Sequence, residues 1–273
     1  MTHFTTSADG TEIAYSITGS GPALVLVDGA MCHRMFGPST ELASVLDKNF
    51  TVYTYDRRGR GETGDGATPW SLEHEVEDID AVIREAGGSA FVFGVSSGAV
   101  LALEAATRLP SISRLAIYEA PFVVDDTYKP RPADIVRQMN DMLARDDRSG
   151  MLSTFMKMVG APGFGVAVMK LTPVWKKLKL VAHTLPWDLT ILGDDGRGSK
   201  LPTDRWTVKV PTLAMDGGKS PEYLRNAMKN VAEVVGADYR TLPGQTHMYK
   251  SSVMAPELVE FFSRAQRTAG PIA

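Results

Sequence analysis

A sharp strand-to-helix turn is predicted at Gly94-Val95-Ser96-Ser97-Gly98, which follows an apolar segment and precedes one rich in Ala and Leu. A serine at such a turn has a strained backbone, and glycines are needed two residues to either side because larger side chains would collide. The helix that follows places its amino end at the serine, where its dipole favours developing negative charge. The pattern therefore predicts that Ser96 is an exposed nucleophile at the edge of a sheet.

Strand-like and helical segments alternate along most of the chain. The wholly apolar run at 23–27 is typical of a strand that is buried on both faces. Apolar residues recur at helical spacing over 72–86, and 99–108 is a second helical segment. Such alternation predicts an α/β fold with a mostly parallel central sheet of about eight strands, flanked by helices. The expected strands cover residues 3–6, 11–18, 23–27, 50–55, 90–94, 115–118, 211–215 and 238–242.

The alternation breaks between residues 122 and 205, where the pattern predicts several helices, most clearly over 132–145. We therefore expect one α/β core formed by residues 1–121 and 206–273, with a helical cap inserted at 122–205. A cap excludes water and shapes a pocket. The methionines of this segment are expected to pack between its helices more than to contact a substrate, because Met is an adaptable filler of core gaps.

Local signals predict where several helices begin. Ser71 is expected to cap the helix at 72–86. Ser220, followed by Pro221 and an acid, is expected to cap the next helix of the core, and the final helix is expected over 256–267. A solvated helix face is expected from four lysines of the insertion, Lys170, Lys176, Lys177 and Lys179.

Composition and charge restrict the class of partner. The 273 residues have a net charge of −3, so no strong positive field favours nucleic acid or an anionic membrane. Cys32 is the only cysteine, which excludes an intrachain disulfide and paired zinc thiolates. No apolar run approaches the roughly 20 residues of a membrane helix, and no signal peptide is evident. These features predict a cytoplasmic protein that acts on a small molecule without metal or cofactor, and they leave its oligomeric state open.

A nucleophilic serine needs a base, and His247 is the histidine best placed to serve as one. It lies in Gly244-Gln-Thr-His247, after the last expected strand and before the last helix. In a parallel sheet, that loop falls on the same carboxyl-terminal edge as the turn at Ser96. The remaining histidines lie in the terminal strand, an early loop, an amphipathic helix and the insertion: His3, His33, His74 and His183.

Taken together, these motifs resemble the α/β-hydrolase superfamily over nearly the whole chain. The matching segments are the strand before Asp28-Gly29, the run Asp56-Arg57-Arg58-Gly59-Arg60-Gly61, the serine turn, Pro211-Thr-Leu and the His247 loop. The resemblance implies an oxyanion hole formed by the backbone N–H groups of Ala30 and Ser97. Asp28 stands where the family usually has histidine. Its carboxylate must then be turned away, paired with an arginine such as Arg34, or protonated.

The acid that would support His247 is not at the family's usual position, which is Ser220 here. Two carboxylates fit the chain order of serine, acid and histidine: Asp216 at the end of one expected strand and Glu119 at the end of the preceding one. We favour Glu119, because some superfamily members have their acid after that strand and because its longer side chain reaches further. A serine–histidine dyad without an acid is the third alternative.

The sequence thus predicts a serine hydrolase that cleaves a small to medium, largely apolar ester or lactone through an acyl-enzyme. A lyase or perhydrolase on the same scaffold is an alternative, and so is a ligand receptor with slow turnover. Gly59, Gly61 and Gly64 also match the G-x-G-x-x-G pattern of dinucleotide sites. That match is weak, because no helix opens on the third glycine and no acid ends a strand about 20 residues further on.

Overall fold

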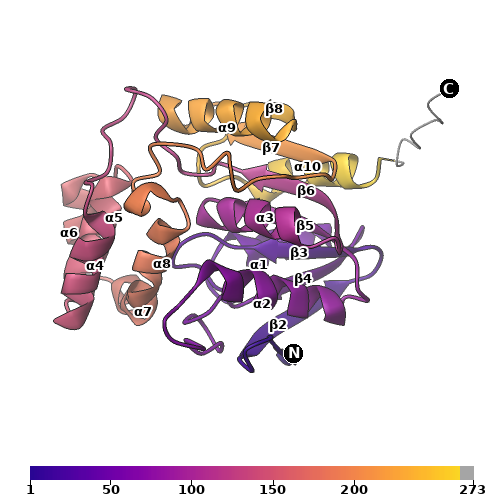
Figure 1. Ribbon diagram of the computed structural model, residues 1–273, viewed down its shortest axis with the longest axis horizontal. Helices are drawn as coiled ribbons and strands as arrows, with labels where there is room; N and C mark the ends of the chain where they lie inside the picture. Colours follow the sequence, from indigo (N-terminus) through magenta and orange to yellow (C-terminus); the bar gives the residue numbers. More distant parts are fainter. Residues whose placement is uncertain (265–273) are drawn as a thin grey trace.

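The computed structural model describes residues 1–264, and its centre is an eight-stranded sheet in the order β1-β2-β4-β3-β5-β6-β7-β8 (Figure 1). β2 is antiparallel to β1 and β4, and all other neighbouring strands are parallel. The predicted fold class, a mostly parallel sheet of about eight strands, is therefore confirmed. The strands are β1 (His3–Thr6), β2 (Glu12–Gly19), β3 (Ala23–Val27), β4 (Thr51–Tyr55), β5 (Ala90–Val95), β6 (Ile112–Tyr118), β7 (Thr212–Gly217) and β8 (Asp238–Leu242).

Helices cover both faces of the sheet, which explains why β3 is apolar throughout. Leu24 and Leu26 of β3 pack with α1 and α10 on one face. Val25 and Val27 point the other way, into the cluster formed with α2, α3 and α9. The covering helices are α1 (Pro38–Leu46), α2 (Leu72–Glu85), α3 (Ser97–Arg108), α9 (Glu222–Val235) and α10 (Ser251–Phe262).

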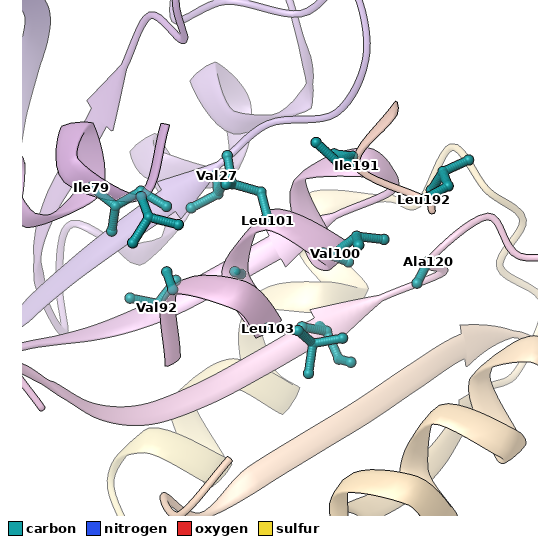
Figure 2. Close-up of a cluster of buried hydrophobic side chains, with 14 of the residues drawn as sticks. Val27, Ile79, Val92, Val100, Leu101, Leu103, Ala120, Ile191 and Leu192 are labelled. Atoms are coloured by element: carbon teal, nitrogen blue, oxygen red, sulfur yellow. The ribbon is translucent and has the colours of Figure 1, made fainter. Parts of the chain in front are cut away.

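Five helices lie between β6 and β7 along the chain, and we call residues 122–205, which contain them, the insertion. Figure 1 shows its helices grouped at one side of the sheet, at the left of the view. Its residues Ile191 and Leu192 are buried and lie beside Val100 of α3 and Ala120 (Figure 2), so the insertion shares the apolar core of the sheet. The helices of the insertion are α4 (Ile135–Ala144), α5 (Arg148–Met158), α6 (Gly163–Met169), α7 (Pro173–Val181) and α8 (Leu185–Thr190), with 3-10 turns at Ala182–Thr184 and Asp194–Gly196.

Two predicted helix starts differ from the structure. α9 begins at Glu222 with Pro221 at the N-cap position, so Ser220 lies one residue before the cap, and its hydroxyl has no hydrogen-bond partner among the described residues. α10 begins at Ser251, so Pro256 lies inside the helix and does not open it. The end of the predicted final helix, residues 265–267, lies outside the described residues. Ser71 caps α2 as expected, since its hydroxyl accepts the N–H of His74.

Within residues 1–264, none of the helices is both long and apolar enough to cross a membrane. The same part of the chain contains no group of three or more His, Cys, Asp and Glu side chains placed to hold a metal ion. The buried acids at the carboxyl edge of the sheet have other partners, which include arginines and a histidine.

Candidate active site

Ser96 lies at the junction between β5 and α3, with φ 57° and ψ −127°. This backbone conformation costs free energy in any residue with a side chain. The turn can form because glycines flank it. A Cβ atom on Gly94 would lie 2.4 Å from the Gly98 carbonyl oxygen, and one on Gly98 would lie 2.3 Å from that of Val27. The sequence thus produces the serine turn by excluding side chains at these two positions.

Positive φ values in non-glycine residues occur at the same edge of the sheet and, at three aspartates, in the insertion. Besides Ser96, Met31 after β3 and Glu119 after β6 have positive φ values, 62° and 48°. Each such residue costs on the order of 1–3 kcal/mol and persists only where the surrounding structure holds it. Strained residues tend to cluster at functional sites. Their presence after three neighbouring strands therefore marks this edge as the candidate site.

The loop after β3 lies directly against the serine. A Cβ atom on Gly29 would lie 2.8 Å from Cβ of Ser96 and 3.4 Å from its Oγ. Ser97 is the first residue of α3, so its N–H has no acceptor within the helix. Among residues 1–264, no protein acceptor is found for the Ala30 N–H either. The two N–H groups that the sequence predicted as an oxyanion hole are therefore free to bind an anionic oxygen.

His247 and Glu119 form a hydrogen-bonded pair. Nδ1 of His247 lies 2.8 Å from Oε2 of Glu119, whose side chain is fully buried. The other carboxylate oxygen of Glu119 accepts the N–H of Gly217 at 2.7 Å. Because Glu119 holds Nδ1, the Nε2 atom of His247 is the ring nitrogen left to act on a substrate or on Ser96. The structure brings these two residues together across 128 positions of the chain.

The loop before His247 is anchored to the sheet on both sides. The phenol of Tyr118, the last residue of β6, donates to the Thr246 carbonyl oxygen at 2.6 Å. The N–H of Lys219 donates to the Gln245 carbonyl oxygen at 2.8 Å. These bonds fix the backbone immediately before the histidine. Within the described part of the chain, the Ser96 hydroxyl itself forms no hydrogen bond, and such bonds often shorten only when substrate binds.

Asp216, the alternative acid, has different partners. It is completely buried at the end of β7 and accepts a hydrogen bond from the phenol of Tyr239. Burial raises the pKa of Asp216, and the nearby charge of Glu119 acts in the same direction. Its second oxygen has no partner among the described residues. Asp216 is therefore bonded to β8, whereas the His247 imidazole is bonded to Glu119.

The other four histidines lie in surroundings unlike that of His247. Their contacts are aromatic, backbone or surface contacts, and none of them pairs with a buried carboxylate. His183 contacts the exposed Asp65 at 2.9 Å, His3 stacks on Tyr15, the backbone of His33 bonds to that of Phe36, and His74 lies in the first turn of α2.

Asp28 is buried and turned toward α1, and the suggested pairing with Arg34 is wrong. The Arg34 guanidinium donates to Asp56 at 3.0 Å, and the backbone N–H of Arg34 donates to the same carboxylate at 2.8 Å. Asp28 instead accepts the Ser39 hydroxyl at 2.6 Å. Burial raises the pKa of Asp28 from 3.8 to about 6, against the opposing effects of Ser39 and Arg60. The carboxyl group is thus only partly ionised near pH 6.

Replacing Asp28 by asparagine is expected to stabilise the protein at neutral pH. A buried acid with a raised pKa holds its proton more tightly in the folded state, so stability is greatest below about pH 4 and falls as the pH rises to about 6. A shift of this size corresponds to about 3 kcal/mol. We expect the difference in unfolding free energy between Asp28→Asn and wild type to grow by about 3 kcal/mol between about pH 4 and neutral pH. Urea denaturation at a series of pH values measures this difference. An exposed control, Asp126→Asn, should follow wild type, and a difference independent of pH would contradict the assignment.

A buried ionic network that the sequence did not reveal lies under the serine turn. Asp188, on α8 of the insertion, accepts hydrogen bonds from Arg57 at 2.9 Å, Arg60 at 2.7 Å and the Ser97 hydroxyl at 2.8 Å. Arg57 also donates twice to the buried Glu75, at 2.6 and 2.8 Å. Burial acts to raise the pKa of Asp188, but Arg60 and Arg57 outweigh it and hold the pKa below its ordinary value. The insertion therefore contributes a carboxylate to the core.

The two arginines of this network also bind the loop after β3. Nη1 of Arg60 donates to the Gly29 carbonyl oxygen at 2.7 Å, and Nη1 of Arg57 donates to that of Asp28 at 3.2 Å. The Gly29 carbonyl and the Ala30 N–H belong to the same planar peptide unit. A guanidinium bonded to this carbonyl therefore fixes the direction in which the Ala30 N–H points.

The glycine-rich segment after β4 packs against the protein's own side chains. A Cβ atom on Gly61 would lie 2.1 Å from a carboxylate oxygen of Asp56, and one on Gly59 would lie 2.8 Å from Asp65 and His183. Carboxylate side chains of the protein therefore occupy the space beside these glycines. In a dinucleotide site, a pyrophosphate would occupy that space. The segment is explained by this packing.

A surface pocket of about 440 Å³ lies between the start of α2 and helices α4 and α8. Trp187 lines it and stacks on Trp70, with ring centroids 5.9 Å apart. Trp175, the other tryptophan of the insertion, is buried and donates to the Ser149 hydroxyl. Neither Ser96 nor His247 lines this pocket. The insertion's tryptophans therefore have structural contacts of their own.

The fold and the serine turn are together typical of α/β hydrolases, and comparison with known proteins identifies the same family. The model of the α/β hydrolase family matches residues 22–260. The chain belongs to this family. A crystal structure of an α/β hydrolase from Sphaerobacter thermophilus is 44% identical and superimposes with a TM-score of 0.87, covering 96% of this chain and 100% of that one.

More distant relatives have described substrates. A pimeloyl-[acyl-carrier protein] methyl ester esterase from Xanthomonas campestris is 34% identical over 144 residues, which are 51% of this chain and 54% of that protein. The chain spans about half the length of the curated relatives it matches. The enol-lactonase from Burkholderia xenovorans is 18% identical with a TM-score of 0.66, covering 96% of this chain and 100% of that chain, and it shares the fold alone.

Proposed function

We propose that this protein is a serine hydrolase that cleaves a small to medium, largely apolar ester or lactone through an acyl-enzyme on Ser96. The observation that supports this best is the strained serine turn on the same sheet edge as the buried Glu119–His247 pair. A serine is a weak nucleophile until a base removes its proton, and the base needs a third group to orient it. The proposal gives these roles to Ser96, His247 and Glu119.

In the first half of the proposed reaction, Nε2 of His247 accepts the Ser96 proton while Oγ attacks the substrate carbonyl. Glu119 keeps the proton on Nδ1 and stabilises the imidazolium that forms. The N–H groups of Ala30 and Ser97 donate to the developing oxyanion. His247 then protonates the leaving alcohol, and in the second half it activates water, which releases the acid and restores Ser96.

We further propose that Arg60 and Asp188 are positioning residues for the oxyanion hole. Arg60 bonds the far end of the peptide unit that presents the Ala30 N–H, and Asp188 holds both Arg60 and the Ser97 side chain. Oxyanion donors contribute to catalysis only when they are aimed at the place where the charge develops. Charge on Arg60 also polarises this amide and strengthens its N–H as a donor.

The preference for an apolar ester or lactone is part of the proposal. The relative from Xanthomonas campestris is named for cleaving a methyl ester, which supports an ester carbonyl as the target. Ile191 and Leu192 of the insertion lie over Val100 and beside Ala120, which follows Glu119 (Figure 2). The insertion thus packs apolar groups against the core next to the site, as expected if it acts as a cap.

The direct test is mass spectrometry after treatment with a fluorophosphonate probe, which reacts with activated serines. We expect one stoichiometric adduct on the peptide that contains Ser96, and no adduct in Ser96→Ala. As a matched control, Ser97→Ala removes the neighbouring hydroxyl and should still be labelled on Ser96. Labelling at another residue, or unchanged labelling in Ser96→Ala, would refute the proposal.

Turnover of p-nitrophenyl esters separates a hydrolase from the other functions that the family's fold allows. Repeated turnover by wild type, lost in Ser96→Ala, is the result expected of a hydrolase. Stoichiometric release of p-nitrophenol without further turnover would instead indicate a receptor that retains the reactive serine.

A further inference from the structure

The surface of the insertion contains an apolar segment that faces solvent. Residues 158–169 include α6 and have no polar side chain. Phe164 and, just beyond the helix, Leu171 are 82% and 88% exposed, and Val168 between them is also exposed. These three residues are spaced i, i+4 and i+7, which places them on one face of a helix. Figure 1 shows α6 at the outer edge of the insertion.

A helix that is apolar all around is normally buried. Soluble proteins rarely leave large side chains grouped in this way, and such patches mark places where another surface binds. Leu180 of α7, 72% exposed, adds to the apolar surface of the insertion. α6 and α7 both pack on α5, so the three helices form one structural unit. We call the exposed surface of α6 and α7 the α6–α7 face.

The segment from Arg148 to Trp187 is basic, although Asp146, which pairs with Arg148, lies just before it. Between residues 148 and 187 there are six Lys and Arg residues and no acid, a net charge of +6; because the whole chain carries −3, the remainder carries −9. The whole-chain charge therefore hides a strong asymmetry. Five of the six are exposed lysines that form no ion pair with other described residues: Lys157, Lys170, Lys176, Lys177 and Lys179.

We propose that the α6–α7 face binds the surface of an anionic lipid bilayer, with Phe164 and Leu171 in the headgroup region and the lysines on lipid phosphates. Apolar side chains on a short helix flanked by lysines are the combination that such interfaces bind. Each lysine near an anionic bilayer adds about fivefold to the partition coefficient. A second copy of this chain is a poorer fit, because a twofold contact would place +6 against +6.

The proposal places the protein at the membrane surface without a membrane-spanning helix. It does not depend on the proposed hydrolase activity, since no catalytic residue lies on the α6–α7 face. The experiment is flotation of the purified protein with phosphatidylcholine vesicles that contain or lack phosphatidylglycerol, at low and at physiological salt. We expect wild type and Ser96→Ala to float equally with the anionic vesicles, less at higher salt, and weakly with the neutral ones.

Two sets of variants test the two halves of the face. Replacing Lys176, Lys177 and Lys179 by Gln is expected to lower partitioning about a hundredfold, at about fivefold per lysine. The matched control replaces three exposed lysines elsewhere, Lys48, Lys209 and Lys229, and should leave partitioning unchanged. Phe164→Ser with Leu171→Ser should also abolish flotation, whereas Phe4→Ser, at an exposed phenylalanine on β1, should not.

Three results would overturn the proposal. They are equal flotation with neutral and anionic vesicles, equal losses in the test and control lysine variants, and absence of flotation by wild type. If wild type fails to float and elutes as a dimer that Leu171→Ser converts to a monomer, the face is a self-association surface. All the substituted side chains are exposed, so circular dichroism should show that each variant retains the wild-type fold.

Discussion

Replacing Glu119 by glutamine is expected to lower kcat for ester hydrolysis by about 10⁴-fold. Glutamine keeps the shape of the side chain and can still accept the Gly217 N–H, but it has no charge to stabilise the imidazolium. Its amide group can also donate to Nδ1 of His247, which would favour the wrong tautomer. Because Glu119 is fully buried, solvent cannot supply the missing interaction. The measurement is steady-state hydrolysis of a p-nitrophenyl ester.

Asp216→Asn is the matched comparison, because Asp216 is equally buried and lies at the end of the next strand. Its hydrogen bond comes from Tyr239 and not from the histidine, so we expect its kcat to stay within about tenfold of wild type. If Asp216→Asn were the more impaired variant, Asp216 would be the supporting acid. If both variants were nearly fully active, Ser96 and His247 would act as a dyad.

Replacing Arg60 by lysine is expected to lower kcat by about 10²-fold while KM changes little. Lysine keeps the positive charge beside Asp188, but its single ammonium group cannot reproduce the two bonds that Arg60 makes to the Gly29 carbonyl and to Asp188. The peptide that presents the Ala30 N–H then loses its fixed direction. Small displacements of an oxyanion donor cost rate at about this level. A loss confined to kcat is expected for an interaction made in the transition state.

Arg58 provides the control for this prediction. It lies two residues away and is equally buried, but its guanidinium pairs with Asp9 and Asp78, away from the loop after β3. Arg58→Lys should lower the melting temperature as Arg60→Lys does, without the loss of kcat. Assays well below both melting temperatures separate the two effects. Equal losses of kcat, or a change in KM alone, would show that Arg60 has only a structural role.

The fold could be predicted from the sequence because its signals are local. The apolar run of β3 fits a strand buried on both faces, and the periodic residues after Ser71 fit a helix. The predicted start of the last helix was wrong because α10 begins five residues before Pro256 and continues through it, although a proline inside a helix removes one backbone hydrogen bond. Ser220 was wrongly predicted as a cap because Pro221, and not Ser220, occupies the N-cap position of α9.

The candidate site could be predicted only in part. Ser96 lies in a local motif, and His247 could be placed from the order of strands and helices. The partner of Asp28 could not be predicted, because the choice between Arg34 and Ser39 depends on side-chain directions in a buried loop. Asp188 was missed altogether. It lies in the insertion, 131 residues from Arg57, and neither residue belongs to a pattern that indicates the other.

The position of Asp188 also limits how this protein can be redesigned. The insertion resembles a separable module along the chain, yet one of its side chains forms ion pairs with two buried arginines of the core. A chimera that receives the corresponding segment of another family member, without an acid at this position, would leave excess positive charge beneath the nucleophile. Removing one partner of a buried ionic group typically costs about 3–5 kcal/mol. New specificities are therefore better sought by changing individual side chains within the native segment than by exchanging it whole.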